Sequence, residues 1–233
     1  MLMAHAGCAS RRKCAAIIKD GLVRVNGKVI KEPGYRIDLS KDKIVYEGRE
    51  IGLQKEKIHI ILNKPKGVLT TTEDTHNRRT VFSLIPKNNC RLYHVGRLDK
   101  DTTGLLLITN DGDFAYRLTH PKFEIERVYE VVVKGRLEDG DVERLQSGIV
   151  LKGKRTSPCK IRILTRDTTS TVAKISLHEG RKRQIRNMFE KIGHQVIVLK
   201  RIRFGPIKLG GLKSGAYRFL SQEEIEKAYR LVF

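Results

Sequence analysis

The chain has 233 residues, and its 47 lysines and arginines outnumber its 26 aspartates and glutamates, which gives a formal net charge of +21. Such an excess of positive charge favours a polyanionic partner, nucleic acid first of all. No apolar stretch reaches the roughly 18 residues of a spanning helix and no signal-peptide pattern begins at Met1, so we expect a cytoplasmic protein without membrane contact.

Residues 1–51 are predicted to form a small N-terminal module. Ser10 is a suitable N-cap for a helix over residues 11–20, and Gly21 follows as the stop. Residues 23–30 read VRVNGKVI, in which Asn-Gly separates two short runs that favour strands. Because a type I′ turn needs a positive φ at both central residues, the Asn-Gly pair predicts a β-hairpin.

Basic residues gather in this module, at the start of the helix and in the adjoining hairpin. They are Arg11, Arg12, Lys13, Arg24 and Lys28. A solvated surface explains any one of them, but as a group in so basic a chain they favour a face that contacts phosphates.

The module resembles the S-four (S4) RNA-binding domain that many ribosome-associated proteins carry. The resemblance lies in AHAGCASRRK at residues 4–13 and in G-x-V-x-V-N-G-K at residues 21–28. The chain begins almost inside the first helix of that domain, and we expect this helix to be incomplete.

Residues 52–57 are predicted to be a polar linker, and residues 58–233 a second domain of mixed strands and helices. Strands are predicted at residues 58–62, 105–108, 128–133 and 171–177. Helices are predicted near residues 112–118, 138–146, 182–192 and 222–231, the last with a capping box of Ser221 and Glu224. The short gaps between these elements favour an α+β fold with a mainly antiparallel sheet and flanking helices.

One carboxylate, Asp99, is placed for chemistry. Residues 94–112 read HVGRLDKDTTGLLLITNDG, so Asp99 follows a cation and an apolar residue in a segment bracketed by glycines and continued by an apolar strand. This pattern is typical of an acid presented at the mouth of a cleft.

Four segments together resemble the RsuA/RluB family of ribosomal RNA pseudouridine synthases. They are LNKPKG at 62–67, the Asp99 run, RVYEV at 127–131 and EGRKRQIRNMF at 179–189. The resemblance implies an S4-type module followed by a pseudouridine synthase catalytic domain. It also implies isomerisation of a uridine in ribosomal RNA, most closely that of the large subunit (23S), without a cofactor.

The resemblance assigns roles to three residues. Asp99 matches the essential aspartate of the family, acting either as a nucleophile on the nucleoside or as a base toward the sugar. Tyr129 would stack on the extracted uracil. A carboxylate in a closing cleft loses water and tends to neutralise, so Arg186 is expected to supply a bidentate partner that keeps Asp99 ionised.

Further arginines are expected to bind RNA around this site. Arg97 would fill the space of the flipped base or clamp its phosphate, although one more surface arginine explains it equally well. Arg181 and Arg183, at the start of a helix, would form a basic wall beside the cleft, together with Lys200, Arg201 and Arg203 nearby in the sequence.

Two other classes of protein compete with this interpretation. A non-catalytic RNA-binding or ribosome-assembly protein would have no reason to place an acid such as Asp99 against a polyanion. A methyl-transferring RNA enzyme would need a glycine-rich nucleotide loop between a strand and a helix, and none is evident. The cysteines and histidines lack zinc spacing, so no metal site is expected, and nothing in the sequence demands more than a monomer.

Overall fold

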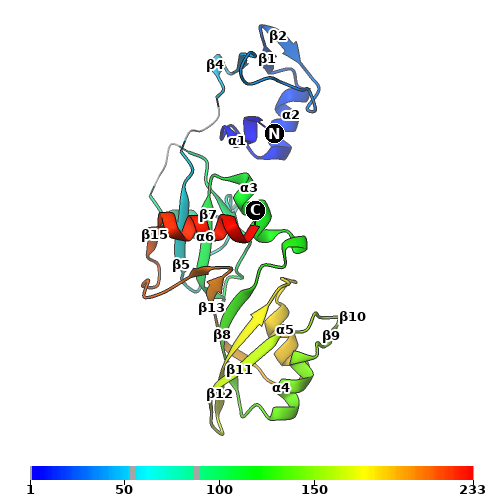
Figure 1. Ribbon diagram of the computed structural model, residues 1–233, viewed down its shortest axis with the longest axis vertical. Helices are drawn as coiled ribbons and strands as arrows, with labels where there is room; N and C mark the ends of the chain where they lie inside the picture. Colours follow the sequence, from blue (N-terminus) through cyan, green and yellow to red (C-terminus); the bar gives the residue numbers. More distant parts are fainter. Residues whose placement is uncertain (1, 53–55, 87–89, 233) are drawn as a thin grey trace. The chain divides into compact units, whose positions relative to one another are not determined.

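The computed structural model describes residues 2–52, 56–86 and 90–232 in two compact units (Figure 1). The first unit contains the described residues up to 58 and the short segments 90–93 and 109–112, and the second contains the rest. Residues 53–55 of the predicted linker lie outside the described residues, and the predicted domain boundaries stay a prediction. None of the described helices is long and apolar enough to cross a membrane.

The first unit combines two short helices with a four-stranded antiparallel sheet in the order β2-β1-β3-β4. Its elements are α1 Leu2–His5, α2 Arg11–Lys19, β1 Val23–Val25, β2 Lys28–Ile30, β3 Ile44–Tyr46 and β4 Arg49–Glu50. The Ser10 hydroxyl accepts a hydrogen bond from the Lys13 backbone N–H at 3.3 Å, which caps α2. Asn26 and Gly27 have φ angles of 50° and 79°. The predicted helix and hairpin are therefore confirmed.

A nine-stranded sheet organises the second unit, with β11-β12-β8-β13-β7-β5-β15 as its main path. Its strands along that path are β5 His59–Lys64, β7 Thr103–Thr109, β8 Arg127–Lys134, β11 Lys160–Arg166, β12 Ser170–Leu177, β13 Val196–Phe204 and β15 Tyr217–Phe219. Beside it lie β6 Tyr93–Val95 and β14 Ile207–Lys208, and β9 Val150–Leu151 pairs with β10 Lys154–Arg155 in a separate hairpin. The strands β11, β12, β8 and β13 pair antiparallel, each with the next, whereas β13 and β7 are parallel.

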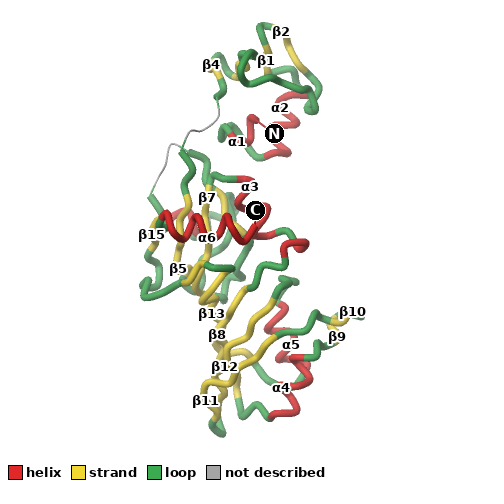
Figure 2. The backbone as a smooth tube through the Cα atoms, viewed as in Figure 1, coloured by secondary structure: helices red, strands yellow, loops and turns green. Residues whose placement is uncertain are grey.

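Four helices of the second unit pack on this sheet. They are α3 Gly112–Thr119, α4 Asp139–Gln146, α5 Gln184–Lys191 and α6 Gln222–Val232, with short 3-10 turns η1 Val81–Leu84 and η2 Pro121–Phe123. α4 and α5 lie on one side of β8, β11 and β12 (Figure 2), where Leu145 and Met188 join a core with Ile175. A second core packs α3 and α6 against β5 and β7. The α+β class with a mainly antiparallel sheet is confirmed, and so are the four predicted helices, with ends shifted by at most two residues.

The capping box at α6 is also present: the Glu224 N–H donates to the Ser221 hydroxyl at 3.2 Å, and the Ser221 N–H donates to the Glu224 carboxylate at 3.0 Å.

Candidate active site

Asp99 lies in the loop between β6 and β7, and each backbone carbonyl from residue 98 to residue 102 accepts a hydrogen bond. The donors are Thr70 Oγ1 to Leu98 at 2.8 Å, Thr102 N to Asp99 at 3.0 Å, Gly67 N to Lys100 at 2.9 Å, Arg186 Nη2 to Asp101 at 3.1 Å and Lys64 Nζ to Thr102 at 2.9 Å. A loop whose carbonyls are all paired has a fixed course. The half-buried Asp99 side chain is therefore held in place from outside its own segment.

Lys64, at the end of β5, is the most buried of these donors. Its side chain is inaccessible to solvent, and its Nζ also donates to Pro65 O at 3.0 Å and to Lys100 O at 3.1 Å. Burial lowers the pKa of Lys64 to about 8, and the nearby charges of Asp101 and Asp99 oppose that shift. Lys64 is the lysine of the LNKPKG segment at 62–67, and its ammonium fixes the loop that carries Asp99.

Lys64→Met is expected to destabilise the protein by about 2 kcal/mol at pH 7, because the Pro65 and Thr102 carbonyls lose their donor inside the protein. The loss should grow at higher pH. The folded pKa of about 8 lies below the ordinary 10.5, so between these values the unfolded chain binds more protons, and the contribution of Lys64 to stability rises with pH. Urea denaturation of both proteins from pH 7 to about 10 measures this difference.

Lys66→Met is the matched control, since Lys66 is exposed in the same turn and should change stability by less than about 0.5 kcal/mol. A difference between the parent and Lys64→Met that shrinks as pH rises would contradict the lowered pKa.

Asp99 faces a hollow of about 470 Å³ in the second unit. Tyr129 on β8 lines the same hollow, with Leu177 and Leu199 as apolar wall and Arg97, Arg181 and Arg183 among its cations. The structure thus brings the predicted acid, the predicted aromatic side chain and three predicted arginines to one cavity. Its mixture of an apolar wall with cations suits a flat base attached to phosphates.

The bidentate pair predicted between Arg186 and Asp99 is wrong in this structure. The Arg186 guanidinium donates to Val196 O and to Asp101 O, both at 3.1 Å, and no ion pair among the described residues joins it to Asp99. Burial lowers the pKa of Arg186, the charge of Arg183 adds to that, and Asp101 and Asp99 oppose it. Arg186 is therefore near enough to act on Asp99 by charge, but its hydrogen bonds position the backbone.

Arg181 is also occupied by the protein itself. Its Nε donates to Glu179 Oε2 at 3.0 Å, and its Nη1 and Nη2 donate to Lys154 O at 3.0 Å and Arg155 O at 2.5 Å. Gln184 Nε2 adds a 2.6 Å bond to Glu179 Oε1. This arginine ties the β9–β10 hairpin to the rim of the hollow, so the structure gives it an anchoring role, and RNA binding by it stays a prediction.

The predicted basic wall is wrong where it includes β13. Arg201 is almost completely buried, with its Nε donating to Leu105 O at 2.8 Å and its guanidinium 4.8 Å from the Phe204 ring centroid. Strand alternation sends Lys200 to the face opposite Leu199. The remaining wall consists of the residues that precede α5, where Lys182 and Arg183 are exposed.

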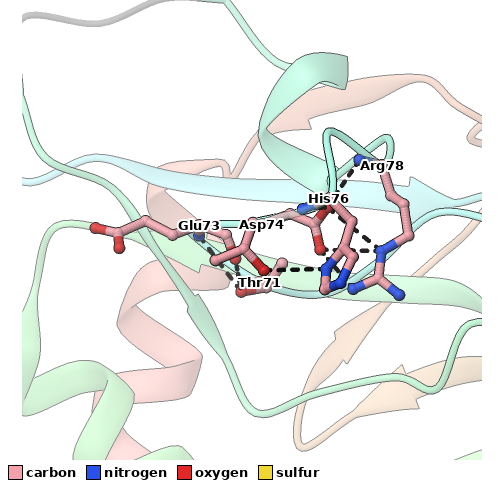
Figure 3. A network of polar contacts seen from close by, with 6 residues as sticks. Thr71, Glu73, Asp74, His76 and Arg78 are labelled. Atoms are coloured by element: carbon pink, nitrogen blue, oxygen red, sulfur yellow. Dashed lines mark hydrogen bonds and ion pairs between the residues drawn. The ribbon is translucent and has the colours of Figure 1, made fainter.

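A second hollow of about 370 Å³ shares Arg97 and Asp99 with the first, and residues of the loop 69–78 line it. Asp74 organises this loop (Figure 3): its carboxylate accepts hydrogen bonds from Arg78 Nη2 and the Arg78 backbone N–H, both at 2.7 Å. The Arg78 side chain lowers the pKa of Asp74 to about 2. Thr71 Oγ1 also donates to Glu73 O at 2.6 Å.

Sequence reasoning missed this Asp74–Arg78 pair. Its signal was an acid and an arginine four residues apart, in the polar segment that begins a few residues after the Lys-Pro-x-Gly turn. The loop is therefore an ordered border of the site, with exposed cations at Arg78 and Arg79.

In the first unit, all five basic residues predicted to contact RNA are exposed, on the first turn of α2 and on the β1–β2 hairpin. Arg24 Nη1 donates to Gly27 O across the hairpin turn at 3.1 Å. Among the described residues, no group of three or more histidines, cysteines or carboxylates is placed to hold a metal ion.

Comparison with known proteins gives consistent matches along the chain. The RNA pseudouridylate synthase family matches residues 58–191, and the S4 domain matches residues 1–44. The chain is 42% identical over 228 residues to a ribosomal large subunit pseudouridine synthase B of Bacillus subtilis (strain 168), covering 97% of this chain and 93% of that protein. It is 38% identical over 231 residues to an uncharacterized RNA pseudouridine synthase of Aquifex aeolicus (strain VF5), covering 99% and 92%.

A crystal structure of a pseudouridylate synthase superimposes with a TM-score of 0.71 at 31% identity, covering 97% of this chain and 96% of that one.

Proposed function

Because the chain belongs to the RNA pseudouridylate synthase family, and carries an N-terminal S4 domain, it is an isomerase of uridine in RNA, and we propose that its substrate is ribosomal RNA of the large subunit. The reaction detaches the base from its ribose at nitrogen and rejoins it through carbon. Asp99 is the proposed essential carboxylate.

The main support for this assignment is the fixed position of Asp99 in a hollow. Its loop is fixed by donors from β5, the following turn and α5, and its side chain shares a hollow with Tyr129. Both uses of the carboxylate, attack on the nucleoside and removal of a proton from the sugar, need an ionised group at a fixed distance from the ribose. The cations of Lys64 and Arg186 lie near this carboxylate.

The other residues of the hollow receive roles in holding the nucleotide. Tyr129 stacks on the extracted uracil, which offsets part of the free energy lost when the base leaves its stack. Arg97 and Arg183, both exposed at the rim, contact the phosphates on either side of the target. Arg186 acts as a positioning residue through the Asp101 carbonyl.

The S4 domain supplies a second contact with the RNA. We assign phosphate binding to its five exposed cations, Arg11, Arg12, Lys13, Arg24 and Lys28. Such contacts add affinity without reading sequence, so they hold the RNA while the catalytic domain selects the uridine. The choice of large-subunit RNA rests on the 42% identity to the Bacillus subtilis protein, and an enzyme with this substrate works in the cytoplasm.

The direct test incubates the purified protein separately with unmodified transcripts of large-subunit and small-subunit ribosomal RNA and maps pseudouridine along each. We expect modification confined to the large-subunit transcript, at one uridine or a small cluster. Modification of the small-subunit transcript alone would overturn the substrate. Tight binding to RNA with no pseudouridine in either transcript would favour the competing function, a ribosome-assembly factor on the same fold.

A further inference from the structure

The sheet of the second unit has a basic face on the side away from Asp99. Successive side chains of a strand point to opposite faces. On β12, Ile175 and Leu177 point into the core beneath α5, so Lys174 and Ser176 point the other way. The register of β11 places Lys160 opposite Ser176 and Arg162 opposite Lys174, which puts these cations on the same outward face.

A hollow of about 500 Å³ opens on this face. The cations that line it, here named the back basic face, are Lys160, Arg162, Lys174, Arg203 and Lys208. The hollow that holds Asp99 is lined instead by Tyr129, Leu177 and Leu199, which belong to the opposite face of the same strands. The two hollows therefore lie on opposite sides of one sheet.

Little negative charge balances these cations. Arg203 forms an ion pair with Glu126, and Glu130 stands opposite both Lys174 and Lys200 in the strand register. Within the described part of the chain, Lys160, Arg162 and Lys208 are exposed and have no ion pair. Lys160 and Arg162, two residues apart on β11, leave the sheet roughly 7 Å from each other. An extended row of cations at this spacing fits a polyanion with regularly repeated charges.

We propose that the back basic face binds the sugar-phosphate backbone of the substrate RNA, at a segment other than the one that enters the Asp99 hollow. The proposal rests on the proposed function for its choice of RNA over an acidic protein. Phosphates repeat along a nucleic acid and are met by arginine and lysine without regard to sequence. A structured ribosomal RNA presents neighbouring helical arms, so one arm contacts this face while another delivers the uridine.

The test variant carries Lys160→Gln, Arg162→Gln and Lys174→Gln. Its affinity for an unmodified large-subunit ribosomal RNA transcript is measured against salt concentration, together with kcat and KM for pseudouridine formation. Each lost phosphate contact lowers the slope of log affinity against log salt by roughly 0.7 to 0.9, so we expect a slope smaller by about 2. KM should rise about tenfold at ~0.1 M salt, with kcat within about twofold of the parent.

A matched variant with Arg144→Gln, Lys191→Gln and Lys227→Gln removes the same charge from exposed positions of α4, α5 and α6. This control should leave slope and KM nearly unchanged. An equal loss in both variants would show that only net charge matters and would overturn the proposal.

A second measurement follows acetylation of Lys160, Lys174 and Lys208 in the unmutated protein, with the transcript or with poly-L-glutamate added. We expect the RNA to slow acetylation at these lysines at least threefold. Unchanged rates with RNA, or protection by poly-L-glutamate alone, would overturn the proposal. The salt slope and the acetylation rates measure RNA binding and do not need turnover. Failure of the proposed function has a different sign, because the unmutated protein would then form no pseudouridine.

Discussion

Asp99→Asn is expected to lower pseudouridine formation at least about 10³-fold while RNA affinity stays within about twofold of the parent. The amide keeps the shape of the side chain but cannot attack a nucleoside or accept a sugar proton. Binding depends on the cations of the S4 domain and the rim of the hollow, and losing one negative charge does not weaken contact with a polyanion. Single-turnover reactions with an excess of enzyme over the large-subunit transcript measure the chemical step directly.

Asp101→Asn is the matched control for this variant, because it removes the same charge two residues further along the same loop. Asp101 is exposed, and the hydrogen bond that it accepts from Arg186 goes to the backbone carbonyl, which the substitution keeps. We expect activity within about tenfold of the parent. Equal losses in the two variants would mean that loop charge, rather than the Asp99 carboxylate, drives the reaction.

The sequence predicts the members of the site better than their contacts. Asp99 and Tyr129 are far apart in the chain, and the structure brings them to one hollow as the motifs imply. The resemblance predicts a direct contact between Arg186 and Asp99, yet Arg186 binds two backbone carbonyls. The motif indicates that an arginine belongs to the site. A guanidinium has five N–H donors, however, and the sequence alone does not determine which acceptors they reach.

β13 is missing from the strands that the sequence predicts, and its pattern of charge is the reason. β13 lies in the middle of the sheet, but cations at positions 200, 201 and 203 interrupt its apolar pattern and hide the strand. Arg201 enters the interior because the Leu105 carbonyl and the Phe204 ring receive its guanidinium. Such acceptors come from tertiary packing and are not visible in the local sequence. A prediction from the polarity of neighbouring residues therefore places these cations on the surface of the cleft.

Arg201 also explains a glycine of the Asp99 run. β13 runs parallel to β7 at this point, with Arg201 in register with Gly104. Gly104 has a φ of +98°, and a Cβ there would lie 2.8 Å from Arg201 N and closer still to Arg201 O. β7, the strand that follows the Asp99 loop, thus contacts β13 through Gly104, a residue with no side chain. This contact sets where the loop leaves the sheet.

Gly104→Ala is accordingly expected to lower the free energy of unfolding by at least about 3 kcal/mol and to reduce pseudouridine formation more than tenfold under conditions where the variant is folded. The methyl group would meet backbone atoms, which cannot rotate away, so β7 and β13 must separate and the Asp99 loop must move. Gly153→Ala isolates the clash, because Gly153 also has a positive φ, +77°, and no atom lies within 4 Å of the position that its Cβ would take. That control carries the backbone strain alone and should cost about 1 kcal/mol with little change in activity. Urea denaturation and single-turnover assays of both variants measure the two effects, and equal destabilisation by the two alanines would show that the close approach of Gly104 to Arg201 does not hold the site in place.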